Sequence, residues 1–322
     1  MQDFVGKYAV ITGGGTGMGR ELARQLVAEG CNVAMCDVSA DAMAETKRLC
    51  EAEKLPQGLR ITTHVADVSI EEHYIRFRDE LIEQQKTDKI HLLFNNAGIA
   101  GGGSMITNSR AQWERTFNIC WGGVYLGVRT FLPLLLKADE GHIVNTSSVN
   151  GFFALGGGGL PHTAYSAAKF AVKGLTEALI TDLRLNAPHI KCSVVMPGHI
   201  GTPILSNTRV ILNGTDRLTP EQLLQARRFM KARGLAVDTM SDEQVQTVAQ
   251  DRARAFRDEA PVTAAQAAKI ILDAVKAGQW RILVGDDAHK LDSWVRREPE
   301  QTYTPEALTR FAKEAGFKDR PL

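Results

Sequence analysis

A glycine-rich turn between a strand pattern and a helix pattern constrains the fold more than any other feature. The apolar, β-prone run Tyr8–Ile11 leads directly into Thr12-Gly13-Gly14-Gly15-Thr16-Gly17-Met18-Gly19, and a helical apolar pattern follows. Glycines let a backbone bend sharply and approach a pyrophosphate, while a helix N-terminus supplies free N–H groups. In this context the turn predicts a dinucleotide-binding βα unit, although a flexible loop is the simpler alternative.

A carboxylate ends the second predicted strand. The apolar run Asn32–Cys36 leads to Asp37 and Val38, and Asp37 lies 18 residues after Gly19. A carboxylate there accepts hydrogen bonds from an adenosine ribose and repels a 2′-phosphate. Neither 13–19 nor 37–46 contains Arg or Lys, although Arg20 is close. This charge pattern favours NAD over NADP, and Asp37 can also cap the helix that follows.

Tyr165 and Lys169 are four residues apart in a helical pattern, so they share one helix face. A cation about 5 Å from a phenol, at an effective dielectric near 20, lowers the phenol pKa by about two units. We therefore expect Tyr165 to exchange a proton with a substrate oxygen near neutral pH. The competing interpretation is an aromatic side chain that only packs on a neighbouring element.

Composition excludes several classes of protein. The 322 residues carry 38 basic and 37 acidic side chains, a net charge of +1, so neither nucleic acid nor an anionic membrane is an expected partner. The five cysteines lack CxxC spacing and predict small core residues of a reduced, cytoplasmic protein without a metal site. No signal-peptide pattern is expected, and no apolar run approaches the roughly 18 residues of a membrane span.

Strand-like and helix-like segments alternate to about residue 200, which predicts a parallel sheet covered by helices on both faces. The predicted strands are 7–12, 32–36, 60–66, 90–95, 142–147 and 190–196, and the predicted helices are 17–29, 40–53, 70–86, 108–137 and 162–186. Residues 203–260 predict a helical insertion, 262–277 a helix and 280–285 a seventh strand. We expect one domain over 1–285 and a charged extension over 286–322 that forms a short ordered arm.

Seven motifs in order resemble the short-chain dehydrogenase/reductase family over about 1–202, with a looser similarity at 262–285. They are Thr12-Gly13…Gly17-Met18-Gly19, Asp67-Val68, Asn95-Asn96-Ala97-Gly98, Asn118, Ser147-Ser148 with Gly151, Tyr165…Lys169, and Pro197-Gly198…Thr202. The resemblance implies a doubly wound, seven-stranded Rossmann sheet with helices on both faces. It also implies a bound dinucleotide and hydride transfer between the nicotinamide and an alcohol or carbonyl carbon.

The same resemblance implies roles for individual residues. Tyr165 would be the general acid/base, and Lys169 would lower its pKa and hold the nicotinamide ribose. Ser148, which fits the family's SxxG pattern, would hydrogen-bond the reacting oxygen, and Asn118 would help relay protons. Simpler roles exist for each, such as Ser148 satisfying backbone groups. The implied cofactor-binding set is Thr12, Gly13, Gly15, Thr16, Gly17, Met18, Gly19, Asp37, Val38, Asp67, Val68, Asn95, Ala97, Gly98, Tyr165, Lys169, Pro197, Gly198, Ile200 and Thr202.

Apolar residues flank the expected reaction point and favour a bulky, hydrophobic secondary alcohol or ketone. The alternative is that half of them face the core. The candidate substrate residues are Ser148, Phe152, Phe153, Leu155, His199, Ile204 and Leu205, with Leu160, Met196 and His162 near them. Residues 209–233 carry six basic and two acidic side chains, a net +4 that either steers an anionic substrate or is a solvated helix face.

These observations predict a metal-free, NAD-dependent alcohol dehydrogenase or ketone reductase acting on a small molecule. By resemblance we expect a homodimer or homotetramer formed by the helices that carry Asn118 and Tyr165. Two alternatives stay open: an epimerase or dehydratase on the same scaffold, and a non-catalytic dinucleotide sensor. The substrate, the direction of reaction and the stereochemistry are not specified by the sequence.

Overall fold

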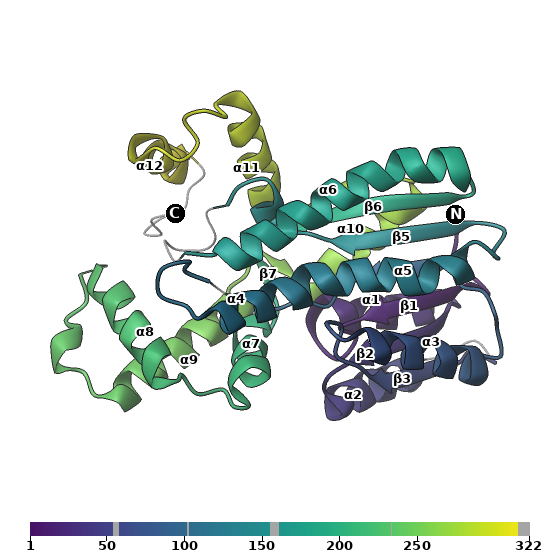
Figure 1. Cartoon of the computed structure of the whole chain (residues 1–322), viewed down its shortest axis with the longest axis horizontal. Helices are drawn as coiled ribbons and strands as arrows, with labels where there is room; N and C mark the ends of the chain where they lie inside the picture. The colour runs from purple at the N-terminus through teal and green to yellow at the C-terminus, as the bar shows by residue number, and fades with distance from the viewer. Residues whose placement is uncertain (54–57, 102, 155–160, 233, 315–322) are drawn as a thin grey trace.

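A computed structural model describes residues 1–53, 58–101, 103–154, 161–232 and 234–314. Its centre is a seven-stranded parallel sheet in the order β3-β2-β1-β4-β5-β6-β9 (Figure 1). The strands are β1 (Tyr8–Thr12), β2 (Asn32–Asp37), β3 (Ile61–Val65), β4 (Leu92–Asn95), β5 (Gly141–Thr146), β6 (Ile190–Pro197) and β9 (Arg281–Val284). The predicted doubly wound sheet and its seventh strand are confirmed.

Helices cover both faces of the sheet. Successive residues of a strand point to opposite faces, and in the central strands both sets are apolar. In β1, Ala9 and Ile11 enter one core while Val10 enters the other. The first core lies under α1 (Gly17–Ala28), α2 (Ala40–Ala52) and α10 (Ala264–Lys276). The second lies under α3 (Glu71–Gln85), α5 (Gly123–Leu135) and α6 (Thr163–Asn186).

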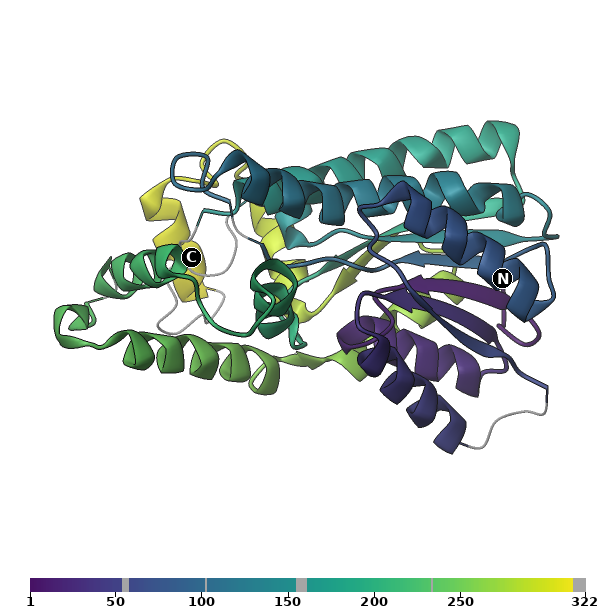
Figure 2. The ribbon, with the colours of Figure 1, turned by 60° about the horizontal axis from the view of Figure 1, so that its bottom comes forward.

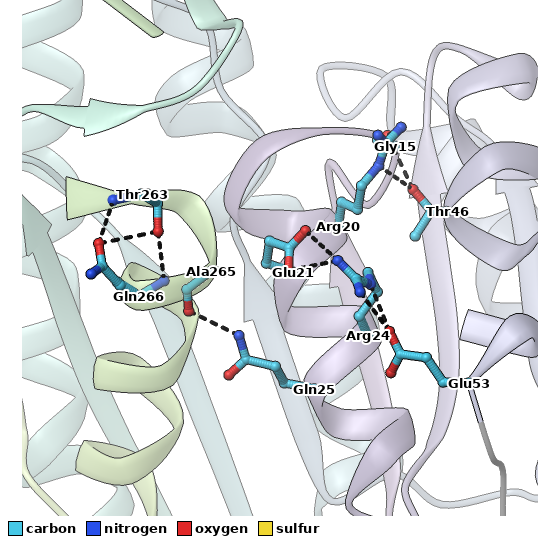
Figure 3. Close-up of polar contacts among 10 residues, drawn as sticks. All are labelled: Gly15, Arg20, Glu21, Arg24, Gln25, Thr46, Glu53, Thr263, Ala265 and Gln266. Atoms are coloured by element: carbon cyan, nitrogen blue, oxygen red, sulfur yellow. Dashed lines mark hydrogen bonds and ion pairs between the residues drawn. The ribbon is translucent and has the colours of Figure 1, made fainter. Parts of the chain in front are cut away.

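Polar side chains of α1 fix this helix between its two neighbours, as Figure 3 shows. Arg20 donates to the Gly15 carbonyl and, at 3.0 Å, to the Thr46 hydroxyl of α2. Gln25 donates to the Ala265 carbonyl of α10 at 2.9 Å. The glycine turn that precedes α1 is therefore anchored to α2 through the Gly15 carbonyl.

The helix predicted over 108–137 is wrong in one respect, because a wide turn divides it. The structure has α4 (Arg110–Phe117), a π-helical turn η1 (Asn118–Gly122) and then α5. The N–H of Gly123 donates to the carbonyl of Asn118, five residues earlier. A Cβ on Gly123 would lie 2.8 Å from a Val68 methyl, so the wide turn coincides with close packing. Such π-turns often occur at functional sites.

The segment predicted as a helical insertion forms three helices closed at their base by a small sheet. These are α7 (Ile204–Asn213), α8 (Pro220–Ala232) and α9 (Asp242–Asp258), and we call residues 203–260 the lid. At the base, β7 (Ile200–Gly201) pairs with β8 (Val262–Thr263). The helix predicted from 262 therefore begins at Ala264, where the Thr263 side chain caps it (Figure 3).

The C-terminal extension is more ordered than the predicted short arm. It forms α11 (Asp286–Arg297) and α12 (Pro305–Glu314), which bury Leu291, Trp294 and Phe311. These apolar residues recur at helical spacing among charged ones. The two helices are therefore amphipathic, and the charged composition of the segment did not indicate them. In Figures 1 and 2 the extension and the lid lie at the same end of the molecule.

None of the helices in the described part of the chain is both long enough and apolar enough to cross a membrane.

Candidate functional site

A cavity lies at the carboxyl ends of the central strands, the usual ligand position in a doubly wound sheet. The glycine turn forms one side of it and the start of the lid the other. Its lining residues are Gly13, Thr16, Gly17, Met18, Asp37, Val38, Ala66, Asp67, Val68, Asn96, Ala97, Gly98, Ile99, Arg115, Ile119, Thr202, Pro203, Ile204, Asn207 and Ile211.

Two glycines give the cavity its close backbone approach. Gly13 has φ +69°, and a Cβ there would lie 2.9 Å from the Ala97 Cα. Gly17 has φ +55°, and a Cβ there would lie 3.1 Å from a Thr202 methyl. The Thr16 side chain does not cap α1, which leaves the first amides of this helix available to a ligand. These features fit the pyrophosphate of a dinucleotide.

Asp37 lies at the end of β2 and lines the same cavity. Its carboxylate accepts the Gly15 N–H at 3.0 Å and the Ser39 N–H at 3.1 Å. A Cβ on Gly15 would lie 2.9 Å from the carboxylate, so glycine is needed for this contact. The carboxylate is held in one orientation at the place expected for the ribose.

Asp67 is paired with a cation that the sequence analysis did not identify. Arg115 of α4 donates to the Asp67 carboxylate at 2.6 Å and to the Ser69 hydroxyl at 2.6 Å. Burial opposes ionisation of Asp67, but the hydrogen bonds from Arg115 and Ser69 hold its pKa below the ordinary value. A single arginine on a predicted helix gives no sequence signal for this role.

Ser148, Tyr165 and Lys169 come together where β5 ends against α6. The Lys169 ammonium lies 5.5 Å from the Tyr165 ring centroid and donates to the Thr146 carbonyl at 2.8 Å. The Ser147 hydroxyl is used structurally, because it donates to the Lys169 carbonyl at 2.7 Å. Ser148 instead contacts the Tyr165 side chain. The hydroxyl beside Tyr165 is therefore that of Ser148, and not that of Ser147.

The expected low pKa of Tyr165 is wrong for the chain as the structure describes it. Burial raises the pKa of the Tyr165 phenol above its ordinary value, although contact with Ser148 lowers it. Burial also lowers the pKa of Lys169, whose side chain is almost completely enclosed. The sequence estimate assumed a partly solvated pair, whereas loss of water around both groups is the larger effect.

Asn118 is exposed, whereas Cys120 lies near Tyr165 and Lys169. The Asn118 side chain is exposed on η1, whereas Cys120 is fully buried and its thiol donates to the Ile99 carbonyl at 3.4 Å. A Cβ on Gly98 would lie 3.6 Å from the Lys169 ammonium and 3.8 Å from the Cys120 sulfur. Within the wide turn η1, Cys120 is therefore the residue that lies near Lys169.

Several predicted cofactor residues shape the cavity without lining it. The Thr12 hydroxyl accepts the N–H groups of Asn96 and Ala97 at 3.0 Å each. Asn95 is buried and donates to Asn145 at 2.8 Å. Gly19, Ile200, Pro197 and Gly198 likewise support the turns around the cavity, and Gly19 lies so close to Gly13 that a Cβ would clash with the Gly13 carbonyl.

The first lid helix closes the cavity. Asn207 of α7 donates to the Thr16 hydroxyl at 2.9 Å, and the Thr208 hydroxyl accepts the Ala100 N–H at 2.8 Å. These bonds connect the lid to the glycine turn and to the loop after β4. Ile204, predicted to meet substrate, lines this cavity, while Leu205 is half-buried outside it.

The predicted substrate residues Phe152 and Phe153 contact other parts of the protein. Phe153 is 1% exposed and packs on Trp294 and Tyr303, with ring centroids 5.4 and 5.6 Å away. Phe152 lies against the Arg281 guanidinium. These aromatic side chains pack in the apolar cluster formed by the C-terminal helices, which the sequence analysis did not predict. Met196 is a fully buried sheet residue, and Leu155 and Leu160 lie outside the described residues.

The two histidines expected at the pocket mouth are in different environments. The His199 ring packs at a tilt against Phe256 of α9, and its Nε2 donates to the Phe256 carbonyl at 2.7 Å. His162 precedes α6, and its ring meets the Tyr165 ring edge-on at 6.2 Å. Burial lowers the pKa of His162.

The basic segment 209–233 does not produce the strong positive field that its net charge suggests. Four of its cations form ion pairs with acidic residues of the lid: Arg209 with Asp216, Arg217 with Glu243, Arg227 with Asp242, and Lys231 with Asp238. Three of these acids, Asp238, Asp242 and Glu243, lie outside the window that gave the net +4. The alternative of a solvated, charge-paired helix face describes the lid better.

Within the described residues, no group of three or more His, Cys, Asp or Glu side chains is arranged to hold a metal ion.

Comparison with known proteins gives a consistent result. A family model described as short chain dehydrogenase matches residues 7–212. The putative oxidoreductase SadH of Mycobacterium tuberculosis is 32% identical over 296 residues, 92% of each chain. Levodione reductase of Leifsonia aquatica is 32% identical over 69% of this chain and 80% of its own length. A solved short chain dehydrogenase/reductase from Burkholderia phymatum in complex with NAD has a TM-score of 0.75 at 30% identity, covering 95% of this chain and 98% of that one.

Proposed function

Because the chain belongs to the short-chain dehydrogenase/reductase family, we propose that it interconverts a secondary alcohol and a ketone with NAD as its cofactor. The coarser statement follows from family membership: the protein is an NAD(P)-binding oxidoreductase that acts on alcohols or ketones. The observation that carries the finer proposal is the meeting of Ser148, Tyr165 and Lys169 beside the Gly98 end of the cavity.

Tyr165 is the proposed acid/base. In alcohol oxidation it removes the hydroxyl proton, and in ketone reduction it returns a proton to the developing alkoxide. Ser148 donates a hydrogen bond to the reacting oxygen and stabilises its charge. The bound nicotinamide supplies or accepts the hydride. Lys169, held by the Thr146 carbonyl, places a positive charge near the phenol and favours its ionised form in the assembled site.

Asp37 is the proposed reason for NAD preference. Its carboxylate lines the cavity and is fixed by two backbone N–H groups. Arg20, the cation directly after the glycine turn, is committed to the Gly15 carbonyl and Thr46. A 2′-phosphate placed here meets a fixed negative charge, whereas a ribose hydroxyl is a suitable donor. The similar structure from Burkholderia phymatum contains NAD.

The proposed substrate is bulky and largely apolar, and the lid is its proposed binding segment. Half-buried apolar side chains of the lid, including Ile204 and Leu205, begin directly after Thr202. We also propose a homo-oligomer, because Tyr125 of α5 and Phe170 of α6 are each 44% exposed on helices that carry the site. The domain limits proposed are 1–285 with the lid inside them, followed by the extension.

The test measures how fast the purified protein oxidises a panel of secondary alcohols, with NAD and NADP in separate series. The readout is the absorbance of the reduced nicotinamide. We expect turnover with bulky apolar alcohols and at least a tenfold higher kcat/KM with NAD. Equal use of NADP would contradict the role of Asp37. Tight NAD binding without turnover across bulky and small alcohols and ketones would contradict the enzymatic proposal and favour a dinucleotide sensor.

A further inference from the structure

The C-terminal extension contacts the turn that leaves β6, in the middle of the family's Pro197-Gly198 motif. The Asp287 carboxylate of α11 accepts the backbone N–H of His199 at 2.6 Å. Its other oxygen accepts the Ala288 N–H at 3.0 Å. One carboxylate therefore joins the beginning of α11 to the beginning of the turn.

Glycine at position 198 makes this approach possible. A Cβ on Gly198 would lie 2.2 Å from one Asp287 oxygen and 2.3 Å from the other, a clash with both. The N–H of Gly198 donates to the Val284 carbonyl at 2.9 Å, which aligns the turn with the end of β9. The turn and the carboxylate are thus fitted to each other over several atoms.

The same turn is fixed at two further points. The His199 ring is bound to the Phe256 carbonyl of α9, so the turn is attached to the lid as well as to α11. Ile200–Gly201 then pairs with β8. Thr202 follows immediately, lines the cavity, and packs against the position of Gly17 in the glycine turn. Any shift of the turn would therefore move one wall of the dinucleotide cavity.

We propose that Asp287 is a positioning residue that holds the Gly198–Thr202 turn against the dinucleotide cavity through the N–H of His199. The C-terminal extension then contributes to cofactor affinity without touching the cofactor. This inference rests on the proposed function only in its choice of ligand, since the cavity and the contacts are independent of any reaction.

The chain offers a matched control for Asp287. Asp286 is the preceding carboxylate in the first turn of α11, but its side chain is exposed. Both acids interact favourably with the N-terminal end of the helix dipole, so removal of either costs the helix a similar amount. Only Asp287 contacts the turn, so a difference between the two variants reports that contact.

The experiment compares wild-type protein with Asp287→Ala, Asp287→Asn and Asp286→Ala, all as full chains. The first readout is the dissociation constant of NADH or NADPH, whichever the wild type binds more tightly, from fluorescence titration. The second is the thermal unfolding midpoint, and the third is the separate measurement of kcat and KM. Reduced-cofactor binding needs neither a substrate nor turnover. It therefore tests this inference even if the proposed reaction is wrong.

We expect Asp287→Ala to weaken cofactor binding about tenfold and to raise the cofactor KM, with Asp286→Ala within twofold of wild type. The amide of Asp287→Asn still accepts the His199 N–H, so its loss should be about threefold. Equal cofactor affinities in Asp287→Ala and Asp286→Ala would overturn the proposal. If Asp287→Ala does not fold, Asp287→Asn decides: a dissociation constant unchanged from wild type would also overturn it.

Discussion

Different kinds of interaction stabilise the sheet and the lid. In the sheet region, polar contacts are buried: Asn95 with Asn145, and Lys169 with the Thr146 carbonyl. In the lid, exposed ion pairs such as Lys231 with Asp238 accompany a small apolar cluster, whose buried members are Met230, Val237 and Val245.

Under the proposed function, this difference separates the residues of the chemical step from those that select the substrate. A buried polar group that loses its partner costs about 1–3 kcal/mol, so the sheet region has few alternative arrangements. An exposed ion pair contributes about 0–1 kcal/mol, so the lid can change sequence at little cost to folding. Variants in the sheet should therefore affect every substrate alike, whereas variants in the lid should affect substrates selectively.

The largest expected effect is from Tyr165→Phe, which removes the proposed acid/base while keeping the ring. We expect kcat to fall about 10³-fold with every substrate, because general acid–base catalysis of this kind contributes 10²–10⁴. Cofactor affinity should stay near wild type. Tyr125→Phe, an exposed tyrosine on α5, is the control. Retention of more than about a tenth of wild-type turnover would rule out the assigned role of Tyr165.

A pH effect should follow from His142, a fully buried residue of β5 that contacts the Ser193 hydroxyl at 2.6 Å. Burial lowers the pKa of His142 from 6.5 to about 4. The unfolded chain therefore binds a proton first as pH falls from 6.5 toward 4, and stability is lost across that window. The loss is about 2.5 kcal/mol at pH 4.5, on the order expected for a shift of this size.

The measurement for His142 is the free energy of unfolding in urea at pH 7 and pH 4.5, for wild type and His142→Gln. The acid-induced loss should be smaller in the variant by about that 2.5 kcal/mol. Identical losses in the two proteins would mean that other groups, such as His64, account for the acid sensitivity of the sheet.

Cofactor choice should depend on the sheet region and not on the substrate. Asp37→Ala removes a fixed negative charge from the cavity, so the NAD-to-NADP ratio of kcat/KM should fall about 30-fold with every alcohol tested. Asp41→Ala, an exposed acid on α2, is the matched control. An unchanged ratio would show that another residue selects the cofactor.

Two buried valines compare the regions directly, since Val194 of β6 and Val245 of α9 are both 0% exposed. Val194→Ala should lower the free energy of global unfolding by about 2 kcal/mol. Val245→Ala should leave global unfolding nearly unchanged and raise the KM of bulky substrates. If both variants lower global stability equally, the lid unfolds together with the sheet and the proposed separation is wrong.

The smallest effect should come from the exposed pair of Arg217 and Glu243 in the lid. Arg217→Ala should change stability by less than about 0.5 kcal/mol and leave cofactor binding as it is. A change above 1 kcal/mol would indicate that the lid depends on its ion pairs more than their exposure implies.

Regular elements and local motifs could be predicted from the sequence because their signals are local. The alternating segments located the seven strands of the sheet, and Gly13, Asp37, Tyr165 and Lys169 each sit within a short recognisable pattern. The positions of the glycine turn and of Ser148 could be predicted because each comes directly after a predicted strand.

Long-range packing could not be predicted in the same way. Phe153 is apolar and close to the site in sequence, but only the folded chain shows that Trp294 and Tyr303 cover it. The wide turn η1 coincides with close packing of Gly123 against Val68, so the position of Cys120 near Lys169 had no local signal. The pKa of Tyr165 likewise depends on burial that spacing alone does not reveal.

The short pairing of β7 with β8 has a consequence for engineering. It brings the two ends of the lid together independently of what lies between them. Loop-closure entropy grows slowly with length, by about 0.6 kcal/mol for each doubling. A longer or foreign helical segment grafted between Thr202 and Val262 would therefore leave the sheet intact, which makes this chain a scaffold for exchangeable specificity modules.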